Sequence, residues 1–512
     1  MTYTKEKSWY RFFALKLVAV LFLLPFTSMA QAVQAVQTTY DTAFIRTYGG
    51  VNFDEAREIR ETPDGGFIIV GTTSSFGQGS TSLYAVKTDY MANHVWSKNY
   101  GGINNDWGYS VENTHDGGFL FTGFSNSFGA NGYDGYIVKT DGNGTQLWQK
   151  IFGDYDWDFL YHSCALPDSG FVLCGETYSN SAGNSDAWLI RVNKDGDTLW
   201  TRKYGSYENE VFNSVITYNN LIYAVGKEYN LLTGKYNAIV KKYDLNGNIK
   251  GSYTYALDSL EDFEYKGIMR TAANKLVLTG VKSFKPDSTA SIIMELDTAL
   301  IYQWQDYGGY QSVKWASRSI ENSKNYVITA GAANGGLGGT AMFMTSFNSG
   351  GNYLDAATFG GTNNEVAYSA VITQDKRMAF VGSTKSMGAG DVDMYLVLMR
   401  KDTLIHDHKQ VFSTYYDTLS LTVIDVKEIS LDNSVNLFPN PFSDKCTISI
   451  SGVEGDEQLT LIVYDLLGSE LMSRTVSPDK PITVNRDALA SGTYFISING
   501  KNIHIRKKLI IE

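Results

Sequence analysis

Cysteine is scarce in this chain, with three residues among 512. A chain of this length with so few cysteines does not depend on disulfide bonds for its fold. Clustered basic residues are missing as well, since 43 Lys and Arg stand against 54 Asp and Glu. Neutralising nucleic-acid phosphates requires such clusters, so the composition excludes a nucleic-acid partner.

The chain also lacks an apolar run long enough to cross a membrane. The run at residues 17–24 lies between Lys16 and Pro25, whereas a span needs about 20 apolar residues. Basic residues precede this run, and Ser28-Met29-Ala30 follows it with small residues where a signal peptidase reads them. This pattern is typical of a signal peptide at residues 1–30, and we expect signal peptidase to cleave after Ala30.

The motifs of several enzyme classes are absent. The sequence contains no nucleophile elbow, no phosphate-binding loop and no HExxH zinc motif. His406 and His408 lack further partners for a metal ion, and the other histidines fall on no shared position. The sequence therefore provides no catalytic residue and no metal-ligand set.

What the chain does have is an internal repeat. An aromatic residue followed by glycine recurs every 52 residues, with one doubled step of 103 where a copy has lost the motif. A second marker, a glycine at the end of an apolar run, defines seven units. These marker glycines are Gly71, Gly123, Gly175, Gly226, Gly280, Gly331 and Gly382.

Each unit has the pattern of four short strands separated by turns. In the second unit we expect strands at 109–113, 118–124, 133–140 and 146–152, joined by Asp-Gly and Asn-Gly turns. Seven such units predict an all-β fold, a seven-bladed β-propeller over residues 41–410, because the repeats of a β-solenoid are shorter. Residues 43–48 resemble a fourth strand without its own blade, so we expect them to complete the last blade and close the ring.

The repeats resemble bacterial β-propeller repeat families that combine DGG, an apolar strand ending in glycine, and VKTDxxGxxxW. Val138-Lys139-Thr140-Asp141, with Gly144 and Trp148, carries this resemblance. The resemblance implies the fold and no single activity, since propellers host many functions.

The last 80 residues, 433–512, have a different pattern. They contain FPNP, an apolar strand ending in glycine, an LxxGxY motif and a basic strand that turns apolar at 505–511. The motif residues are Phe438, Pro439, Asn440, Pro441, Gly468, Leu489, Gly492 and Tyr494. This region resembles the type A sorting domain of type IX secretion substrates, which is a small β-sandwich. In this chain a linker at 411–432 precedes it. The resemblance implies passage through the periplasm, export by the type IX secretion machinery, and a protein that is secreted or attached to the outer cell surface.

A carboxylate recurs four residues after the repeated aromatic-glycine motif. In a propeller this position begins the innermost strand, so these side chains are expected around one mouth of the channel. The residues are Asp54, Asp106, Asp158, Glu210 and Glu365. Two interpretations stay open: the ring binds a cation such as Ca²⁺ or the hydroxyls of a sugar, or each carboxylate accepts hydrogen bonds from its own turn. Repetition in nearly every unit favours the second.

Aromatic residues near the same mouth are candidates for stacking on sugar rings. These are Trp107, Trp157 and Trp315. The loops between second and third strands differ between units, as on a recognition face mounted on a rigid scaffold.

Cys164 and Cys174 flank a tight turn at 167–170. On two hairpin strands they lie nearly opposite one another, and both a cross-strand disulfide and two small buried residues fit this placement.

These patterns favour a surface or secreted propeller that binds a carbohydrate or protein partner without catalysis. One alternative is an extracellular polysaccharide hydrolase or lyase that uses carboxylates at the channel mouth. That chemistry needs two carboxylates with different pKa values, and the near-equivalence of the repeated positions argues against it. The other alternative is a structural surface component.

Overall fold

A computed structural model describes residues 44–130, 132–256, 261–285, 288–307, 313–334, 339–399, 435–450, 458–464, 470–477, 482–486, 489–499 and 504–511. The predicted signal peptide at 1–30, the predicted linker at 411–432 and Gly468 lie outside the described residues. Within these residues there is no helix long and apolar enough to span a membrane.

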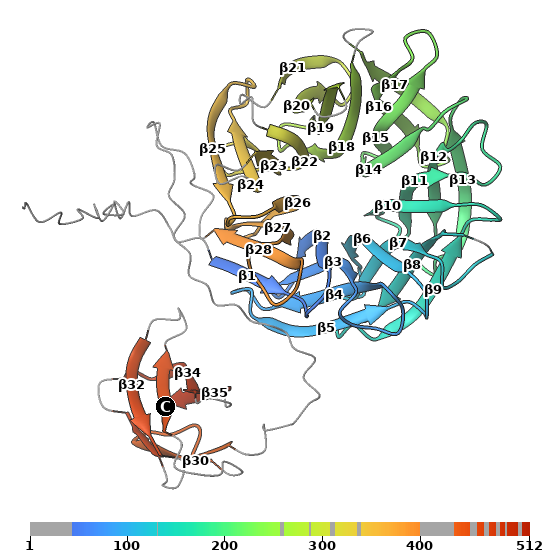
Figure 1. The fold of residues 1–512 in the computed structure, drawn as a ribbon. Helices are drawn as coiled ribbons and strands as arrows, with labels where there is room; N and C mark the ends of the chain where they lie inside the picture. The colour runs from blue at the N-terminus through green and yellow to red at the C-terminus, as the bar shows by residue number, and fades with distance from the viewer. Residues whose placement is uncertain are drawn as a thin grey trace, which may run out of the picture.

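Seven four-stranded antiparallel sheets surround a central axis, and their first strands contact one another all the way round it (Figure 1). Blade 1 contains β2 (Asp54–Glu61), β3 (Phe67–Thr73), β4 (Ser82–Thr88) and β5 (His94–Tyr100). Blade 2 contains β6 (Asp106–Asn113), β7 (Phe119–Ser125), β8 (Asp134–Thr140) and β9 (Gln146–Phe152). Blade 3 contains β10 (Asp158–Ala165), β11 (Phe171–Thr177), β12 (Asp186–Val192) and β13 (Thr198–Tyr204). Blade 4 contains β14 (Val211–Tyr218), β15 (Leu221–Asn230), β16 (Lys235–Asp244) and β17 (Ile249–Tyr255).

The remaining three blades follow the same order along the chain. Blade 5 contains β18 (Asp262–Arg270), β19 (Lys275–Lys285), β20 (Ser288–Asp297) and β21 (Tyr302–Asp306). Blade 6 contains β22 (Val313–Glu321), β23 (Val327–Asn334), β24 (Thr340–Phe347) and β25 (Tyr353–Phe359). Blade 7 contains β26 (Glu365–Ile372), β27 (Met378–Thr384), β28 (Asp393–Met399) and the N-terminal strand β1 (Phe44–Tyr48).

The ring is closed by β1, which pairs antiparallel with β28 from Phe44 opposite Leu398 to Tyr48 opposite Met394. The first described strand thus completes the last blade, as predicted. Tyr48 is fully buried, and its hydroxyl donates to the carbonyl of Ala92 in blade 1, which joins the closing strand to the next blade. The predicted fold class, a seven-bladed β-propeller followed by a small β-sandwich, is confirmed.

The marker glycines are required because the first and second strands of each blade approach closely at these positions. Each one lies on the second strand of its blade, and a Cβ at any of the seven would lie 1.7–2.0 Å from a carbonyl oxygen of the innermost strand. No side chain fits at that distance, so the position accepts only glycine.

The innermost strands share a β-bulge directly after the pair that each marker glycine forms. The register shifts there in all seven blades and leaves one residue unpaired. A bulge bends a strand and redirects a side chain. We call these seven residues the bulge ring: Arg57, Tyr109, Tyr161, Asn213, Lys266, Ser317 and Tyr368.

The C-terminal module consists of two antiparallel sheets, with orders β29-β30-β33 and β32-β31-β34-β35. Its strands are β29 (Val435–Phe438), β30 (Lys445–Ile450), β31 (Leu459–Tyr464), β32 (Glu470–Val476), β33 (Ile482–Asn485), β34 (Gly492–Asn499) and β35 (His504–Ile511). Apolar residues from both sheets form one buried core. The side chain of Asn440 fixes the FPNP segment to β35. Its Nδ2 donates to Lys508 O (2.8 Å), and its Oδ1 accepts from Ile510 N (2.8 Å).

Candidate ligand-binding site

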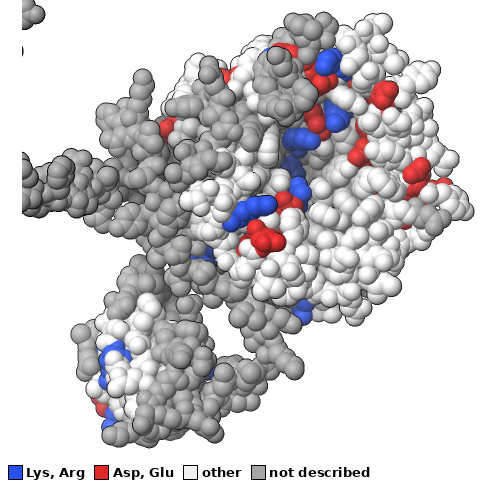
Figure 2. Space-filling model, viewed as in Figure 1, with Lys and Arg blue, Asp and Glu red and all other residues white. Residues whose placement is uncertain are grey.

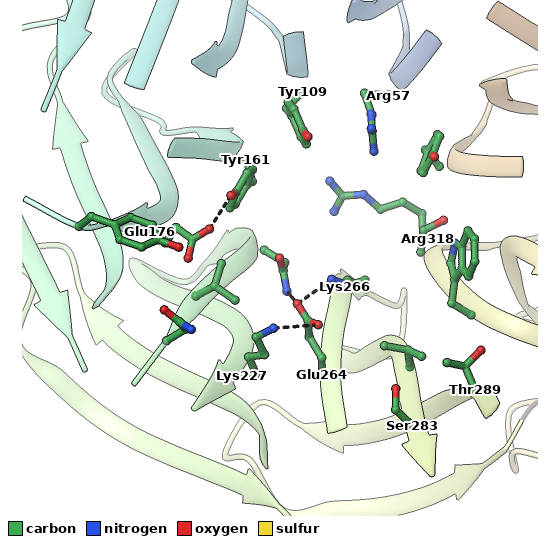
Figure 3. A pocket seen from close by; sticks show the side chains of 18 residues that line it. Arg57, Tyr109, Tyr161, Glu176, Lys227, Glu264, Lys266, Ser283, Thr289 and Arg318 are labelled. Atoms are coloured by element: carbon green, nitrogen blue, oxygen red, sulfur yellow. Dashed lines mark hydrogen bonds and ion pairs between the residues drawn. The ribbon is translucent and has the colours of Figure 1, made fainter. Parts of the chain in front are cut away.

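A cavity of about 740 Å³ occupies the channel, and all seven residues of the bulge ring line it. Figure 2 shows basic and acidic side chains gathered in the hollow at the centre of the propeller. Figure 3 shows the lining side chains pointing into the cavity from strands all around it. The repeated bulge therefore brings seven different side chains into one site.

One side of the cavity is aromatic. Tyr109 and Tyr161 from blades 2 and 3 lie with ring centroids 5.3 Å apart, and Tyr161 stacks on Phe159 at 6.2 Å with nearly parallel planes. Phe124 contacts both Phe159 and Trp107. We call these five residues the aromatic wall: Tyr109 and Tyr161 line the cavity, and Phe159, Phe124 and Trp107 lie outside the lining.

A second part of the lining, from blades 4 and 5, is charged. The Glu264 carboxylate of blade 5 accepts hydrogen bonds from Lys266 Nζ (2.6 Å) and Asn213 Nδ2 (2.8 Å). It also forms a longer ion pair with Lys227 (3.4 Å). Burial alone raises the pKa of Glu264, but the two lysines and the hydrogen bonds outweigh it and lower the pKa to about 2. We call these four residues the ionic wall, in which the carboxylate is ionised at neutral pH.

Arg57 lies between two tyrosine rings of the bulge ring. Its guanidinium carbon is 4.9 Å from the ring centroid of Tyr109 and 4.2 Å from that of Tyr368. Its Nη2 is 2.6 Å from the Glu55 carboxylate. Two cation–π contacts and one ion pair hold this arginine at the edge of the cavity.

The channel floor is formed by the residue that follows the bulge in three blades: Glu58, His162 and Arg318. Glu58 Oε1 lies 3.3 Å from His162 Nε2 and 3.6 Å from Arg318 Nη2. The Nδ1 of His162 accepts the Val215 N–H (3.2 Å), so the neutral ring carries its proton on Nε2. Burial, followed by the charge of Arg318, lowers the pKa of His162 to about 4.

The repeated carboxylates predicted to ring the mouth are all present, and all five are buried. Each accepts a hydrogen bond from a backbone N–H of its own turn, as the second interpretation expected: Gly50 to Asp54, Gly102 to Asp106, Asp154 to Asp158, Ser206 to Glu210 and Gly361 to Glu365. We call them the turn carboxylates. None of them lines the cavity. In the described part of the chain, no three His, Cys, Asp or Glu side chains come together to hold a metal ion.

The three predicted tryptophans differ in position. Trp315 lines the cavity. Trp107 belongs to the aromatic wall, where it stacks on Phe124. Trp157 is 51% exposed and contacts Phe159 and Tyr178, so it extends the aromatic surface from the cavity outward.

The cysteine pair does not lie directly opposite. Cys164 faces Val172 and Cys174 faces His162, which makes the two cysteines diagonal neighbours, and both are free thiols. Diagonal positions in an antiparallel pair are about 7–8 Å apart, beyond the usual reach of a disulfide. Cys174 is fully buried and Cys164 partly so, the placement that the interpretation as two small residues expects.

The sequence-based prediction misses the bulge ring and the channel floor. A usable signal exists, because each bulge residue lies 14 positions before its marker glycine, or 13 in blade 4. Aligning the units on that glycine places the seven side chains in register.

The C-terminal module matches a family model described as a secretion system C-terminal sorting domain, over residues 436–512. This module is a sorting domain. It makes the chain a substrate of the type IX secretion machinery, which exports it for release or for attachment to the cell surface. The predicted resemblance and localisation are thereby confirmed, while signal-peptide cleavage stays a prediction.

One further relative is similar to this chain over a short stretch. An endo-acting ulvan lyase from Formosa agariphila is 31% identical over 96 residues, which are 17% of this chain and 18% of that protein. The chain thus spans less than a fifth of that relative's length.

Solved structures with propeller folds give low overall similarity. The WD40 β-propeller domain of Doa1 matches 71% of this chain and 98% of its own, with a TM-score of 0.45 and 10% identity. A protein of unknown function from Dyadobacter fermentans matches 72% and 99%, with a TM-score of 0.43 and 12% identity. The seven-bladed architecture rests on the strand pairing itself.

Proposed function

We propose that the propeller is an extracellular binding module that takes a carbohydrate into the channel cavity. The observation that carries this proposal is that tyrosine rings of the aromatic wall and the charged side chains of the ionic wall line one cavity of about 740 Å³. Aromatic faces pack against the apolar face of a sugar ring, while amide and charged groups bind its hydroxyls.

The cavity is better suited to binding than to hydrolysis. A glycosidase needs one carboxylic acid that is protonated and one carboxylate that is not. Two glutamates line the cavity, Glu176 and Glu264. Glu264 is held ionised by its lysines, and Glu176 accepts hydrogen bonds from Tyr161 (2.6 Å) and Ser185 (2.8 Å). Both glutamates thus act as hydrogen-bond acceptors that fix the walls.

The test is a glycan-array screen on the purified chain, with turnover measured on every polysaccharide that binds. The variants are Trp157→Ala and Tyr178→Ala, at the outer end of the aromatic surface. The matched control is Tyr302→Ala, which removes a 47% exposed aromatic residue from the outermost strand of blade 5.

We expect a bound glycan, no product release, and affinity about tenfold lower in Trp157→Ala and in Tyr178→Ala, corresponding to about 1–2 kcal/mol per lost aromatic contact. Product release from a bound polysaccharide overturns the proposal in favour of an enzyme. Failure of every glycan to bind shifts the function to a protein partner or a structural role.

A further inference from the structure

We infer that the cavity contains an oxyanion subsite between Arg57 and Arg318, and that the ligand is an acidic glycan carrying a carboxylate or a sulfate ester. This inference rests on the proposed carbohydrate-binding function and names the class of glycan. The two arginines come from opposite parts of the chain, blades 1 and 6, and Figure 3 shows both guanidinium groups pointing into the middle of the cavity.

Arg57 has donor capacity that the protein does not use. Its Nε is buried and has no hydrogen-bond partner among the described residues. Its one ion pair is to Glu55, on the strand position two residues earlier. The two tyrosine rings fix the plane of the guanidinium, so a ligand anion meets a donor group that is already oriented.

Arg318 is also incompletely paired. Its Nη1 donates to the Ser214 hydroxyl (2.5 Å), a neutral acceptor, and its Nη2 is 3.6 Å from Glu58, beyond hydrogen-bond distance. Burial lowers the pKa of this arginine, against the opposing effect of Glu58. An anion beside it offsets that cost.

The residues that line the cavity carry a net positive charge, which also favours an anionic ligand. Four cationic side chains line the cavity, Arg57, Lys227, Lys266 and Arg318, against two carboxylates, Glu176 and Glu264. Glu264 is already shared by the two lysines. The acidic neighbours of the two arginines, Glu55 and Glu58, lie outside the lining, so the lining itself carries more positive than negative charge. Guanidinium groups bind carboxylate and sulfate oxygens through paired N–H donors.

A neutral sugar uses only part of this site. Its hydroxyls satisfy the ionic wall and its ring covers the tyrosines, but the N–H donors that the two arginines keep beyond their contacts with Glu55 and Glu58 receive no anion from such a ligand. An acidic sugar supplies the ring and the anion together, which is why the geometry selects it.

The test compares matched ligands on the full chain by calorimetry at constant ionic strength. Polygalacturonate is paired with its methyl ester, dextran sulfate is paired with dextran, and sodium sulfate serves as a simple anion. The variants are Arg57→Gln, Arg57→Lys and Glu55→Gln. Arg202→Gln, on the outermost strand of blade 3, removes the same charge away from the cavity. Thermal unfolding of each variant confirms that it is folded.

We expect at least one acidic polymer to bind about tenfold or more tightly than its neutral partner, since a hydrogen bond to a charged group contributes this much. Arg57→Gln removes the preference, Arg57→Lys restores part of it, and Arg202→Gln keeps it. Glu55→Gln removes the internal competitor for Arg57 and increases the affinity. The polymer that binds shows whether the anion is a carboxylate or a sulfate.

The outcomes separate the inference from the proposed function. Equal binding of charged and neutral partners overturns the anion subsite and leaves the glycan-binding function standing. Sulfate binding that depends on Arg57, with no polymer bound, supports the subsite and overturns the glycan function. No binding of sulfate or of any polymer overturns both.

Discussion

Each turn carboxylate lies three residues before the bulge residue of its blade, yet the two groups differ in residue identity, in burial and in what they contact. The turn carboxylates are nearly the same residue in five blades, are buried, and are bonded to their own backbone. The bulge ring has a common backbone geometry but includes Arg, Tyr, Asn, Lys and Ser, and it faces the cavity. In this repeat, the turn carboxylate that most blades share stabilises the blade. The β-bulge that all blades share directs side chains of five types into the cavity.

The channel floor tests this division most strongly, because its residues vary between blades as the bulge ring does. Glu58 and His162 are nevertheless buried as the turn carboxylates are, while Arg318 also lines the cavity. Glu58 is the centre of the floor, with His162, Arg60 and Arg318 around it. We expect Glu58→Ala to lower the free energy of unfolding by about 3–5 kcal/mol, because it leaves buried cations without a counter-charge. Denaturant unfolding measures the change.

The matched control is Ser369→Ala, at the equivalent position of blade 7. A loss of about 1 kcal/mol or less is expected there, because the buried serine carries no charge. If Glu58→Ala is equally mild, the floor is not a structural cross-brace, and its charges belong functionally with the cavity.

The second prediction compares the two groups within one strand. Asp106 accepts from Gly102 N (2.7 Å), Ser127 Oγ (2.7 Å) and Ser125 Oγ. We expect Asp106→Ala to cost about 2–3 kcal/mol, since three donors lose a buried charged acceptor. Tyr109→Phe, three residues further on, should change stability by less than about 0.5 kcal/mol. Similar losses of thermal stability in both variants contradict the division into scaffold and site.

The sequence predicted the blades because the repeat period, the turn glycines and the closing strand are local patterns. The strands expected in the second unit agree with β6 to β9 to within a few residues. The marker glycine was visible for the same reason, since the close approach that requires it recurs in every blade.

The site could not be predicted in the same way. A bulge is a shift of register between two strands, and no single residue type marks it, since the seven bulge residues belong to five types. The pairing of Glu58 with His162 and Arg318 crosses the axis between blades 1, 3 and 6, so it depends on ring closure. Repetition marks positions that most blades need for their own fold, such as the turn carboxylates. The cavity residues vary between blades, so a search for repeated residues does not find them.

The third prediction concerns acid stability at the floor. His162 is neutral in the folded protein, with a pKa of about 4 against 6.5 for an unburied histidine. Between these values the unfolded chain binds a proton that the folded chain does not, so stability falls as the pH decreases from 6.5 to 4. We expect His162→Gln, which keeps a donor and an acceptor, to remove about 2 kcal/mol of this loss. An unchanged pH profile places the acid sensitivity elsewhere.

The smallest expected effect comes from carboxylates that meet between blades near the turn carboxylates. Asp134 of blade 2 and Asp158 of blade 3 flank Gly153, where a Cβ would lie 2.2 and 2.5 Å from their oxygens. Burial, followed by the charges of Asp158 and Asp154, raises the pKa of Asp134 to about 6. The Oδ1 of Asp158 has no hydrogen-bond partner among the described residues.

A folded pKa of about 6, above the ordinary 3.8, means that the folded chain keeps a proton that the unfolded chain loses between these values. Stability therefore falls as the pH rises from 3.8 to 6 and stays lower above 6. We expect Asp134→Asn to raise stability by about 1 kcal/mol at pH 8, after allowance for screening by water near the turn, and by nothing at pH 3.5. The equivalent position in blade 1 is Ser82, so Ser82→Asp creates the same pair with Asp106 and should destabilise the protein more at pH 8 than at pH 3.5. Thermal unfolding at the two pH values measures both variants. Opposite and pH-dependent shifts support a like-charge cost between blades, whereas equal shifts at both pH values show that packing, and not charge, sets the preference at this position.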